Sequence, residues 1–288
     1  MPSEFALIRK HFTRPARHTD LAVGDDAALI RPSAGMQLAI STDMLVAGTH
    51  FFADTDPEDL GWKALAVNVS DLAAMGAQPR WVVLAASLPA PDEAWIAAFA
   101  RGFFACSEAF GIDVIGGDTT RGPLNLCPTI FGEVPVGSAV TRAGARPGDD
   151  LWVSGAPGRA ALGLALRGLA SAMLDVSDGL LGDLGHILEQ SAVGAVISEE
   201  ALPLAPLQAA CGDAALAFRA CTAGGDDYEL LFTAPAAHRA EVGALAGQLG
   251  VPLHRIGAIT PPDQGLRLRG HDGQLRPLAA RGYDHFGR

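Results

Sequence analysis

The chain has 288 residues, enough for two domains, and its 49% hydrophobic content predicts a sizeable buried core. A formal net charge of -11 argues against an electrostatic nucleic-acid footprint, and it would repel an anionic substrate unless cations invert the local field. No apolar run approaches the ~20 residues of a membrane span, and the amino-terminal stretch has no apolar signal core. Four cysteines without C-x-x-C spacing indicate reduced thiols in a cytoplasmic protein.

Helices and strands alternate along the first half of the chain. We expect helices over 3–12, 56–75 and 91–110, and strands over 27–31, 37–43, 49–53, 80–88, 113–117 and 124–134. Asp56 followed by Pro57 predicts a helix start, and Gly76 and Gly111 are typical helix ends.

A joint rich in Gly and Pro, residues 142–150, separates the two halves and predicts a domain boundary. Beyond it we expect strands over 150–155, 194–198, 228–234 and 254–260, helices beginning near 158 and 177 and spanning 237–249, and a hairpin around 271–273. The interleaved pattern predicts an α/β or α+β fold with two domains, 1–145 and 146–288.

Carboxylates recur where apolar runs end. Asp25, Asp26, Asp43, Asp118, Asp175, Asp178, Asp226 and Asp227 all follow such runs, most of them beside glycine. For any single pair the simpler interpretation is a turn or a helix cap, because Asp and Gly favour turns.

That simpler interpretation fails at two places. Asp71 lies in an expected helix that is apolar almost all round, on one face with Asn68. Ser41, Thr42 and Asp43 are expected to break a strand, although neither Gly nor Pro is present there. A buried carboxylate needs a charged partner or a metal, and the chain has only two lysines against nineteen arginines. We therefore expect a hard cation with oxygen ligands, Mg²⁺ or else Mn²⁺ or Ca²⁺.

The usual nucleotide signatures are absent. The chain has no P-loop, Rossmann or protein-kinase motif. Residues 116–122, with consecutive glycines, hydroxyls and Arg121, offer a weak signal for a phosphate nest. Composition and pattern thus predict a two-domain enzyme with a multi-carboxylate metal site that handles phosphates.

Several motifs together, in order along nearly the whole chain, resemble one family. They are "GDDAAL", "ISTDMLVAGTHF", "KALAVNVSDLAAMGAQP", "IGGDTTRGP", "TRAGARPGD", "LDVSDGLLGDLGHI", "GGDDYELLF" and "GYDHF". The chain resembles the thiamine-monophosphate kinase family, of the ATP-binding superfamily of aminoimidazole ribonucleotide synthetase and selenophosphate synthetase. The resemblance implies a homodimer whose amino-terminal domains pair strands across the interface, with ATP and several Mg²⁺ bound to each subunit.

The resemblance also implies roles for individual residues. It implies metal ligands at Asp26, Ser41, Thr42, Asp43, Asp71, Asp118, Asp175 and Asp178, ATP contacts at Gly117, Asp118, Arg142 and Ser177, and thiamine-phosphate contacts at His50, Asp226 and Tyr283. No residue is expected to act as a general base.

Two features depart from the family. Asp226 stands where the family commonly has Glu, so the side chain is one methylene shorter. Between Gly163 and Asp175 the family carries tens more residues, so this chain has either lost a loop or omits a mobile stretch.

The implied reaction is transfer of the ATP γ-phosphoryl group to thiamine monophosphate, giving thiamine diphosphate and ADP. Two alternatives stay open at this point: another ATP-dependent enzyme of the same superfamily, or a non-catalytic protein that binds metal and nucleotide. A selenophosphate synthetase is disfavoured because those enzymes use an early Cys or selenocysteine, and the first Cys here is Cys106.

Overall fold

The computed structural model describes residues 4–155, 159–280, 282 and 283. The chain forms two compact units. Unit 1 comprises residues up to 72 and 77–137, and unit 2 comprises residues 73–76 and those from 138 onward. Among the described residues, no helix combines the length and the apolar character needed to cross a membrane.

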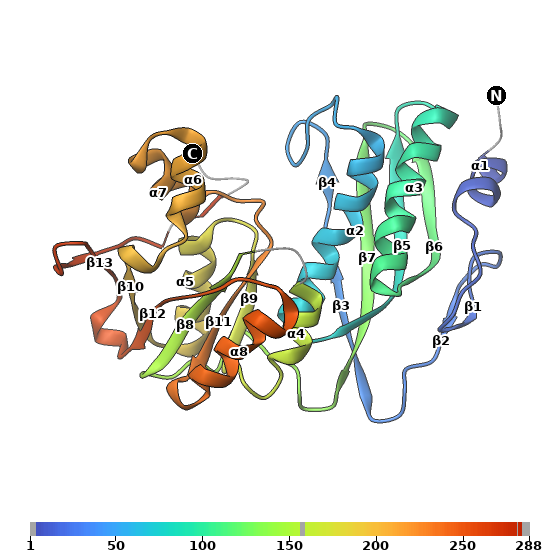
Figure 1. The fold of residues 1–288 in the computed structure, drawn as a ribbon. Coiled ribbons are helices and arrows are strands. Elements are labelled where there is room, and N and C mark those ends of the chain that lie inside the picture. Colours follow the sequence, from blue (N-terminus) through green and yellow to red (C-terminus); the bar gives the residue numbers. More distant parts are fainter. Residues whose placement is uncertain (1–3, 156–158, 281, 284–288) are drawn as a thin grey trace. The chain divides into compact units, whose positions relative to one another are not determined.

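Unit 1 is built around a five-stranded mixed sheet (Figure 1). Its helices are α1 (Glu4–His11), α2 (Pro57–Ala74) and α3 (Glu93–Phe110), and its strands are β1 (Thr19–Leu21), β2 (Leu29–Ile30), β3 (Met36–Thr42), β4 (Leu45–Val46), β5 (Gln78–Leu88), β6 (Asp113–Arg121) and β7 (Asn125–Pro135). The main sheet has the order β3-β7-β5-β6, with β4 also paired to β7, while β1 and β2 form a separate pair. Among the described strands of this sheet, β5 and β6 are the one parallel pair.

Helices α2 and α3 lie side by side across the sheet of unit 1 (Figure 1). Two glycines allow this close approach: a Cβ added at Gly61 would lie 2.1 Å from the Phe99 carbonyl oxygen, and one at Gly102 would lie 1.7 Å from that of Glu58. Both distances are far inside van der Waals contact, so any larger residue would push the helices apart. Local signals also set the helix ends, because Gly76 and Gly111 adopt φ of 63° and 67°.

Unit 2 is built around a seven-stranded sheet of order β14-β13-β10-β12-β8-β11-β9. Its strands are β8 (Asp149–Ser154), β9 (Ala172–Val176), β10 (Gly194–Ser198), β11 (Glu229–Pro235), β12 (Leu253–Thr260), β13 (Leu266–Arg269) and β14 (Leu275–Pro277); its α-helices are α4 (Arg159–Ala165), α5 (Leu180–Ser191), α6 (Leu204–Cys211), α7 (Ala214–Ala223) and α8 (Arg239–Leu249), and its short 3₁₀ helices are η1 (Glu199–Ala201), η2 (Ala236–His238) and η3 (Pro262–Gln264).

The central strands of unit 2 are buried on both faces. Along β8, Leu151 and Val153 pack into one hydrophobic cluster with the apolar side of α5, whereas Trp152 packs into another with α4 and α8. Successive side chains of a strand point to opposite faces, so the continuous apolar run of β8 serves both clusters. The two faces together form the core of this unit.

The structure corrects several local predictions. The strand expected over 49–53 is not formed, because residues 48–50 turn and Phe51 makes only an isolated bridge to Ala47. The strand expected over 27–31 is reduced to β2, and β9, α6 and α7 were not predicted at all. Helix α5 begins at Leu180, three residues after the expected start, whereas residue 158 lies outside the described residues.

The connection from α4 to β9 is short and ordered by hydrogen bonds. The N–H of Ala170 donates to the carbonyl oxygen of Leu166 (2.9 Å), and the N–H of Ser171 donates to that of Thr233 (2.8 Å). Leu166 itself is fully buried. At this point, where the resemblance leads us to expect tens of additional residues, the chain passes directly from helix to strand.

Candidate functional site

In unit 1 the predicted ligands at the end of β3 do lie beside helix α2. Ser41 Oγ donates a hydrogen bond to Asp71 Oδ2 (2.5 Å), and the backbone N–H of Asp43 donates to Asn68 Oδ1 (3.2 Å). Burial, together with the negative charge of Asp71, raises the pKa of Asp43 to about 6. A carboxylate whose pKa is raised by burial and by a neighbouring carboxylate marks a place where a cation would be stabilised.

One detail of this segment differs from expectation. Ser41 and Thr42 do not break the strand: they continue the β3 ladder opposite Ile130 and Thr129 of β7, and only Asp43 lies beyond its end. The Thr42 hydroxyl donates to the carbonyl oxygen of Pro128 (2.9 Å) and accepts from the Thr129 hydroxyl (3.0 Å). The backbone of a paired strand therefore fixes these two hydroxyls relative to Asp43.

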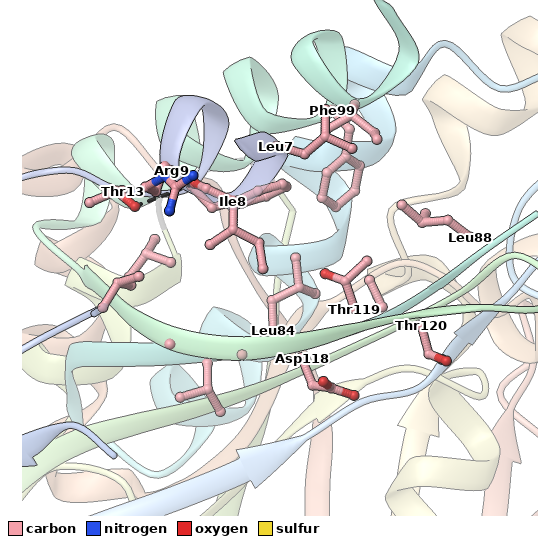
Figure 2. A pocket seen from close by; sticks show the side chains of 18 of the residues that line it. Leu7, Ile8, Arg9, Thr13, Leu84, Leu88, Phe99, Asp118, Thr119 and Thr120 are labelled. Carbon is pink, nitrogen blue, oxygen red and sulfur yellow. Dashed lines mark hydrogen bonds between the residues drawn. The ribbon is translucent and has the colours of Figure 1, made fainter. Parts of the chain in front are cut away.

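Three further predicted residues, Asp26, Gly117 and Asp118, line one cavity of about 1470 Å³ in unit 1. Figure 2 shows that Leu84, Phe99 and Thr119 lie on one side of β6, whereas Asp118 points to the other. Leu84 and Phe99 thus form an apolar part of the cavity wall, and the Asp118 carboxylate points away from them.

The geometry of β6 corrects the interpretation of residues 116–122. Asp118 does not lie in a turn, because β6 extends to Arg121 and pairs in parallel with β5, with Asp118 opposite Ala85. Gly117 has φ of 154°, and a Cβ there would lie 2.0 Å from the Leu84 carbonyl oxygen, so only glycine fits. The segment is extended and is not a closed nest of N–H groups.

His50 is oriented by the backbone. Its Nδ1 accepts a hydrogen bond from the Val46 N–H (3.0 Å), and its carbonyl oxygen accepts one from Lys63 Nζ (3.1 Å). Because Nδ1 is the acceptor, the ring is held as the neutral tautomer with the proton on Nε2. The backbone of its own turn therefore fixes the orientation of the His50 ring.

In unit 2 the loop after β9 brings four predicted residues together. Ser177 and Asp178 follow the strand directly, the N–H of Asp226 donates to the Ser177 carbonyl oxygen (2.8 Å), and the N–H of Tyr283 donates to that of Asp178 (2.8 Å). Asp175 lies within β9 itself, opposite Leu230, and is buried. ATP-assigned and substrate-assigned residues thus share one hydrogen-bonded loop.

Arg142 stands apart from this loop in the hydrogen-bonding pattern. Its side chain is exposed, and its carbonyl oxygen accepts a hydrogen bond from Ser191 Oγ (3.2 Å). The described residues contain no group of three or more His, Cys, Asp and Glu side chains arranged to hold a metal by themselves. Six of the eight predicted ligands belong to unit 1, and Asp175 and Asp178 belong to unit 2.

Sequence reasoning missed two side chains that support these loops. Asp183 of α5 accepts hydrogen bonds from the backbone N–H groups of Ser177 and Asp178. Arg159 of α4 donates to the carbonyl oxygens of Asp227 (3.3 Å) and Tyr228 (2.6 Å). A carboxylate on the apolar face of a helix was the available signal for Asp183, whereas nothing local marks Arg159.

Similarity to known proteins extends along nearly the whole chain. Residues 24–134 match the N-terminal domain of AIR synthase related proteins, and residues 146–268 match the C-terminal domain. The chain is 42% identical to the thiamine-monophosphate kinase of Salmonella typhimurium, with 98% of each protein covered. That alignment spans 319 residues, more than the 288 of this chain, so it includes positions at which this chain has no residue.

Solved structures show the same relationship. A thiamine-monophosphate kinase from Stenotrophomonas maltophilia superposes with a TM-score of 0.85 at 42% identity, covering 95% of this chain and 98% of that chain. A second structure, AaThiL complexed with AMPPCP and TMP, gives a TM-score of 0.76 at 26% identity, covering 98% and 97%. The chain belongs to the thiamine-monophosphate kinase family, among the AIR synthase related proteins.

Proposed function

We propose that the chain transfers the γ-phosphoryl group of ATP to the phosphate of thiamine monophosphate, giving thiamine diphosphate and ADP. The observation that carries this proposal is the 42% identity to a thiamine-monophosphate kinase over 98% of both proteins. The related complex with AMPPCP and TMP supports the same pair of reactants, because AMPPCP is an unreactive analogue of ATP.

We assign the nucleotide to the cavity of unit 1. Its apolar wall, which includes Leu84 and Phe99, suits a nucleobase, and Asp118 would contact phosphates through a bound cation. Ligand pockets are mostly apolar with a few well-placed polar groups, as here. The glycine at 117 is required because the Leu84 carbonyl oxygen of β5 occupies the space of a side chain. The family resemblance also implies ATP contacts at Arg142 and Ser177, which belong to unit 2.

Mg²⁺ fits the donor set of this chain. The proposed ligands are all oxygens: Asp26, Ser41, Thr42, Asp43, Asp71, Asp118, Asp175 and Asp178. The raised pKa of Asp43 beside Asp71 is the observation that supports a cation there. Mg²⁺ is commonly bound through one or two carboxylates, with water and substrate phosphates filling its other positions, so no large protein cluster is needed. When bound, it would neutralise charge on the phosphates.

The acceptor needs no general base. A phosphate monoester has a second pKa of about 6 and is already a nucleophile at neutral pH. The protein therefore has to hold the phosphate of thiamine monophosphate in line with the γ-phosphate of ATP. We assign His50 Nε2–H as a donor to the substrate, and Asp226 and Tyr283 as further substrate contacts.

Asp226 has a backbone reason to differ from the family's Glu. Its φ is 69°, in the left-handed region, where Asp is found several times more often than most residues. The neighbouring Tyr228 also has positive φ, at 53°, and Arg159 bonds to its carbonyl oxygen. The loop thus has a backbone conformation that Asp adopts more readily than most residues do.

We also propose a homodimer formed through unit 1. In the described residues, β3 pairs with β7 alone, so its outer edge offers unpaired backbone groups. Met36 and Ile40 of this strand are 37% and 59% exposed. Sedimentation at micromolar concentration should give twice the 29.7 kDa subunit mass. A monomer under these conditions would contradict the dimer but not the kinase activity.

The cytoplasm is the proposed location. All four cysteines, Cys106, Cys127, Cys211 and Cys221, are free thiols in the structure. Free thiols are typical of reducing compartments. Residues 1–145 are proposed to bind ATP and Mg²⁺ and to dimerise, and residues 146–288 form the second domain.

The decisive experiment measures products. Purified protein with ATP, Mg²⁺ and thiamine monophosphate should form ADP and thiamine diphosphate in equal amounts, separated by chromatography. ATP consumption with other phosphate acceptors but not with thiamine monophosphate would instead favour another enzyme of the superfamily. Binding of ATP and Mg²⁺ without any turnover would favour a non-catalytic protein. The Asp43→Asn variant serves as the matched inactive control.

A further inference from the structure

Asp183 is a buried carboxylate that no step of the proposed reaction uses. It lies in the first turn of α5 and is 3% exposed. Its neighbours on the same helix face, Leu180, Leu184 and Ile187, are apolar and belong to the core. An ionisable side chain in such a row is costly unless its oxygens are hydrogen-bonded.

The hydrogen bonds of Asp183 reach backward along the chain. Its Oδ2 accepts from the backbone N–H of Ser177 (3.0 Å) and from that of Asp178 (3.0 Å). Both donors lie before the helix begins, so Asp183 does more than satisfy its own helix terminus. Charge-assisted bonds of this kind are about twice as strong as neutral ones.

The carbonyl groups of the same loop, residues 176–179, are also engaged. Ser177 accepts from the N–H of Asp226, and Asp178 accepts from the N–H of Tyr283. The N–H groups of the loop therefore point to Asp183, while its carbonyl groups hold the two residues assigned to the substrate. This loop therefore connects a residue assigned to ATP, Ser177, with the two residues assigned to thiamine monophosphate.

The packing leaves this loop little freedom to shift. A Cβ at Gly225 would lie 2.7 Å from the Ser177 carbonyl oxygen, and one at Gly179 would lie 2.9 Å from the Gly224 carbonyl oxygen. Residues 176–179 and 224–226 thus touch through their backbones. Because the two backbones are tightly packed, a displacement of residues 176–179 would also displace residues 224–226.

We propose that Asp183 is a positioning residue: its single oxygen Oδ2 fixes the backbone of Ser177 and Asp178, and through this loop it sets Asp226 and Tyr283. The proposal rests on the proposed function for the roles of those residues. The positioning itself is a geometric claim that can be tested without any activity.

Three variants separate positioning from general stability. Asp183→Ala removes the acceptor, whereas Asp183→Asn keeps one side-chain oxygen that can accept both N–H bonds. Ile187→Ala, on the same face of α5 and fully buried, removes core packing without touching the loop. Each variant is studied by thermal melting, steady-state kinetics and hydrogen–deuterium exchange of the peptide that spans 176–179.

For Asp183→Ala we expect faster exchange at 177 and 178 and a fall in kcat of about 10–100-fold, the usual range for residues that orient ligands. Asp183→Asn should stay within about threefold of the parent in kcat, because a neutral acceptor retains most of a hydrogen bond. Ile187→Ala should lower Tm at least as much as Asp183→Ala, with kcat nearly unchanged below its melting temperature.

Unchanged exchange at 177 and 178 in Asp183→Ala would overturn the proposal, whatever the activity. So would a fall in kcat that follows Tm equally in Asp183→Ala and Ile187→Ala, since that pattern indicates a purely structural residue. If the parent protein fails to phosphorylate thiamine monophosphate, the proposed function is wrong, and the exchange measurement still decides the role of Asp183.

Discussion

Unit 1 contains two aspartates with opposite electrostatic surroundings, Asp113 at the start of β6 and Asp43 just beyond β3. The Asp113 carboxylate accepts hydrogen bonds from the backbone N–H groups of Arg17 and His18 (2.9 and 2.6 Å) and from the Thr19 hydroxyl (2.8 Å). Burial by itself raises its pKa, but these bonds outweigh burial and hold the pKa below the usual value. The negative charge of Asp113 is therefore stabilised by groups of the protein itself.

The negative charge of Asp43 is not stabilised in this way. Burial and the charge of Asp71 both raise its pKa, to about 6. The protein has therefore placed two carboxylates close together where hydrogen bonds alone do not offset their repulsion. The difference indicates that an aspartate which receives backbone N–H groups stabilises the fold, whereas one that faces another carboxylate is a candidate cation ligand.

Removing the charge of Asp43 tests whether this aspartate is a metal ligand. Asp43→Asn should reduce kcat by more than about 100-fold, because a direct ligand should matter more than the residues that orient ligands. The Tm of the metal-free protein should not fall. A carboxylate whose pKa is raised in the folded state destabilises that state at neutral pH, and Asn removes the charge.

Asp71→Asn should behave in the same way, since the two carboxylates act on each other. Kinetics at saturating Mg²⁺ and melting with and without Mg²⁺ supply the measurements. Near-parental turnover in either variant would remove that residue from the metal site. A large fall in Tm without metal would show that the carboxylate is structural, as Asp113 is.

The opposite outcome is expected for Asp113→Asn. Losing the charge and placing an amide group among N–H donors should cost about 3 kcal/mol in the free energy of unfolding, given roughly 1.5–3 kcal/mol for a hydrogen bond to a charged group. Because the folded pKa of Asp113 is depressed, its stabilisation is present above pH about 4 and is lost as pH falls through the folded pKa.

The matched control is Asp92→Asn at the start of α3. Asp92 accepts from the N–H groups of Ala94 and Trp95, and Asn caps helices about as well as Asp. Urea denaturation at pH 7 should therefore separate the two variants clearly. Equal stability losses would mean that the bonds of Asp113 to residues 17–19 contribute little.

Some of these features follow from sequence and others do not. Helices α2 and α3 were predicted closely because their ends carry local signals, Asp56 and Asp92 at the start and Gly76 and Gly111 at the end. Strand β9 was missed because a short run with a carboxylate in it resembles a loop, and only its pairing with β11 makes it a strand. The extent of β6 likewise depends on β5, which lies far away in the chain.

In the candidate site, too, some residues could be predicted from the sequence and others depend on tertiary structure. Asp71 was singled out because an apolar helix makes any carboxylate conspicuous, and its bond to Ser41 confirms that the β3 end lies beside α2. Asp113 and Asp183 look equally conspicuous in hindsight, yet their roles depend on N–H groups brought in by tertiary structure. Sequence reveals which residues carry charge but not which donors will meet them.

The pH dependence of metal binding sharpens the contrast between Asp43 and Asp113. Mg²⁺ binds the deprotonated carboxylate, so its affinity should fall as pH drops below the Asp43 pKa of about 6. With this value the affinity at pH 5.5 should be about fourfold weaker than at pH 7.5. Calorimetric titration with Mg²⁺ at both values measures the change, and the dependence should disappear in Asp43→Asn but persist in Asp113→Asn. A dependence that survives Asp43→Asn would assign the titration to another group.

The smallest effect is expected at Tyr283, whose N–H donates to the Asp178 carbonyl oxygen and whose side chain is 57% exposed. If the ring faces the cationic thiazolium, Tyr283→Ala should raise KM for thiamine monophosphate about threefold, the scale of an exposed cation–π contact. The backbone bond remains in the variant, so KM for ATP and Tm should barely change. Tyr283→Phe is the matched control and should retain the parental KM, because the ring face carries the attraction. If Tm falls and both KM values rise together, the tyrosine only fastens the chain end to the loop after β9.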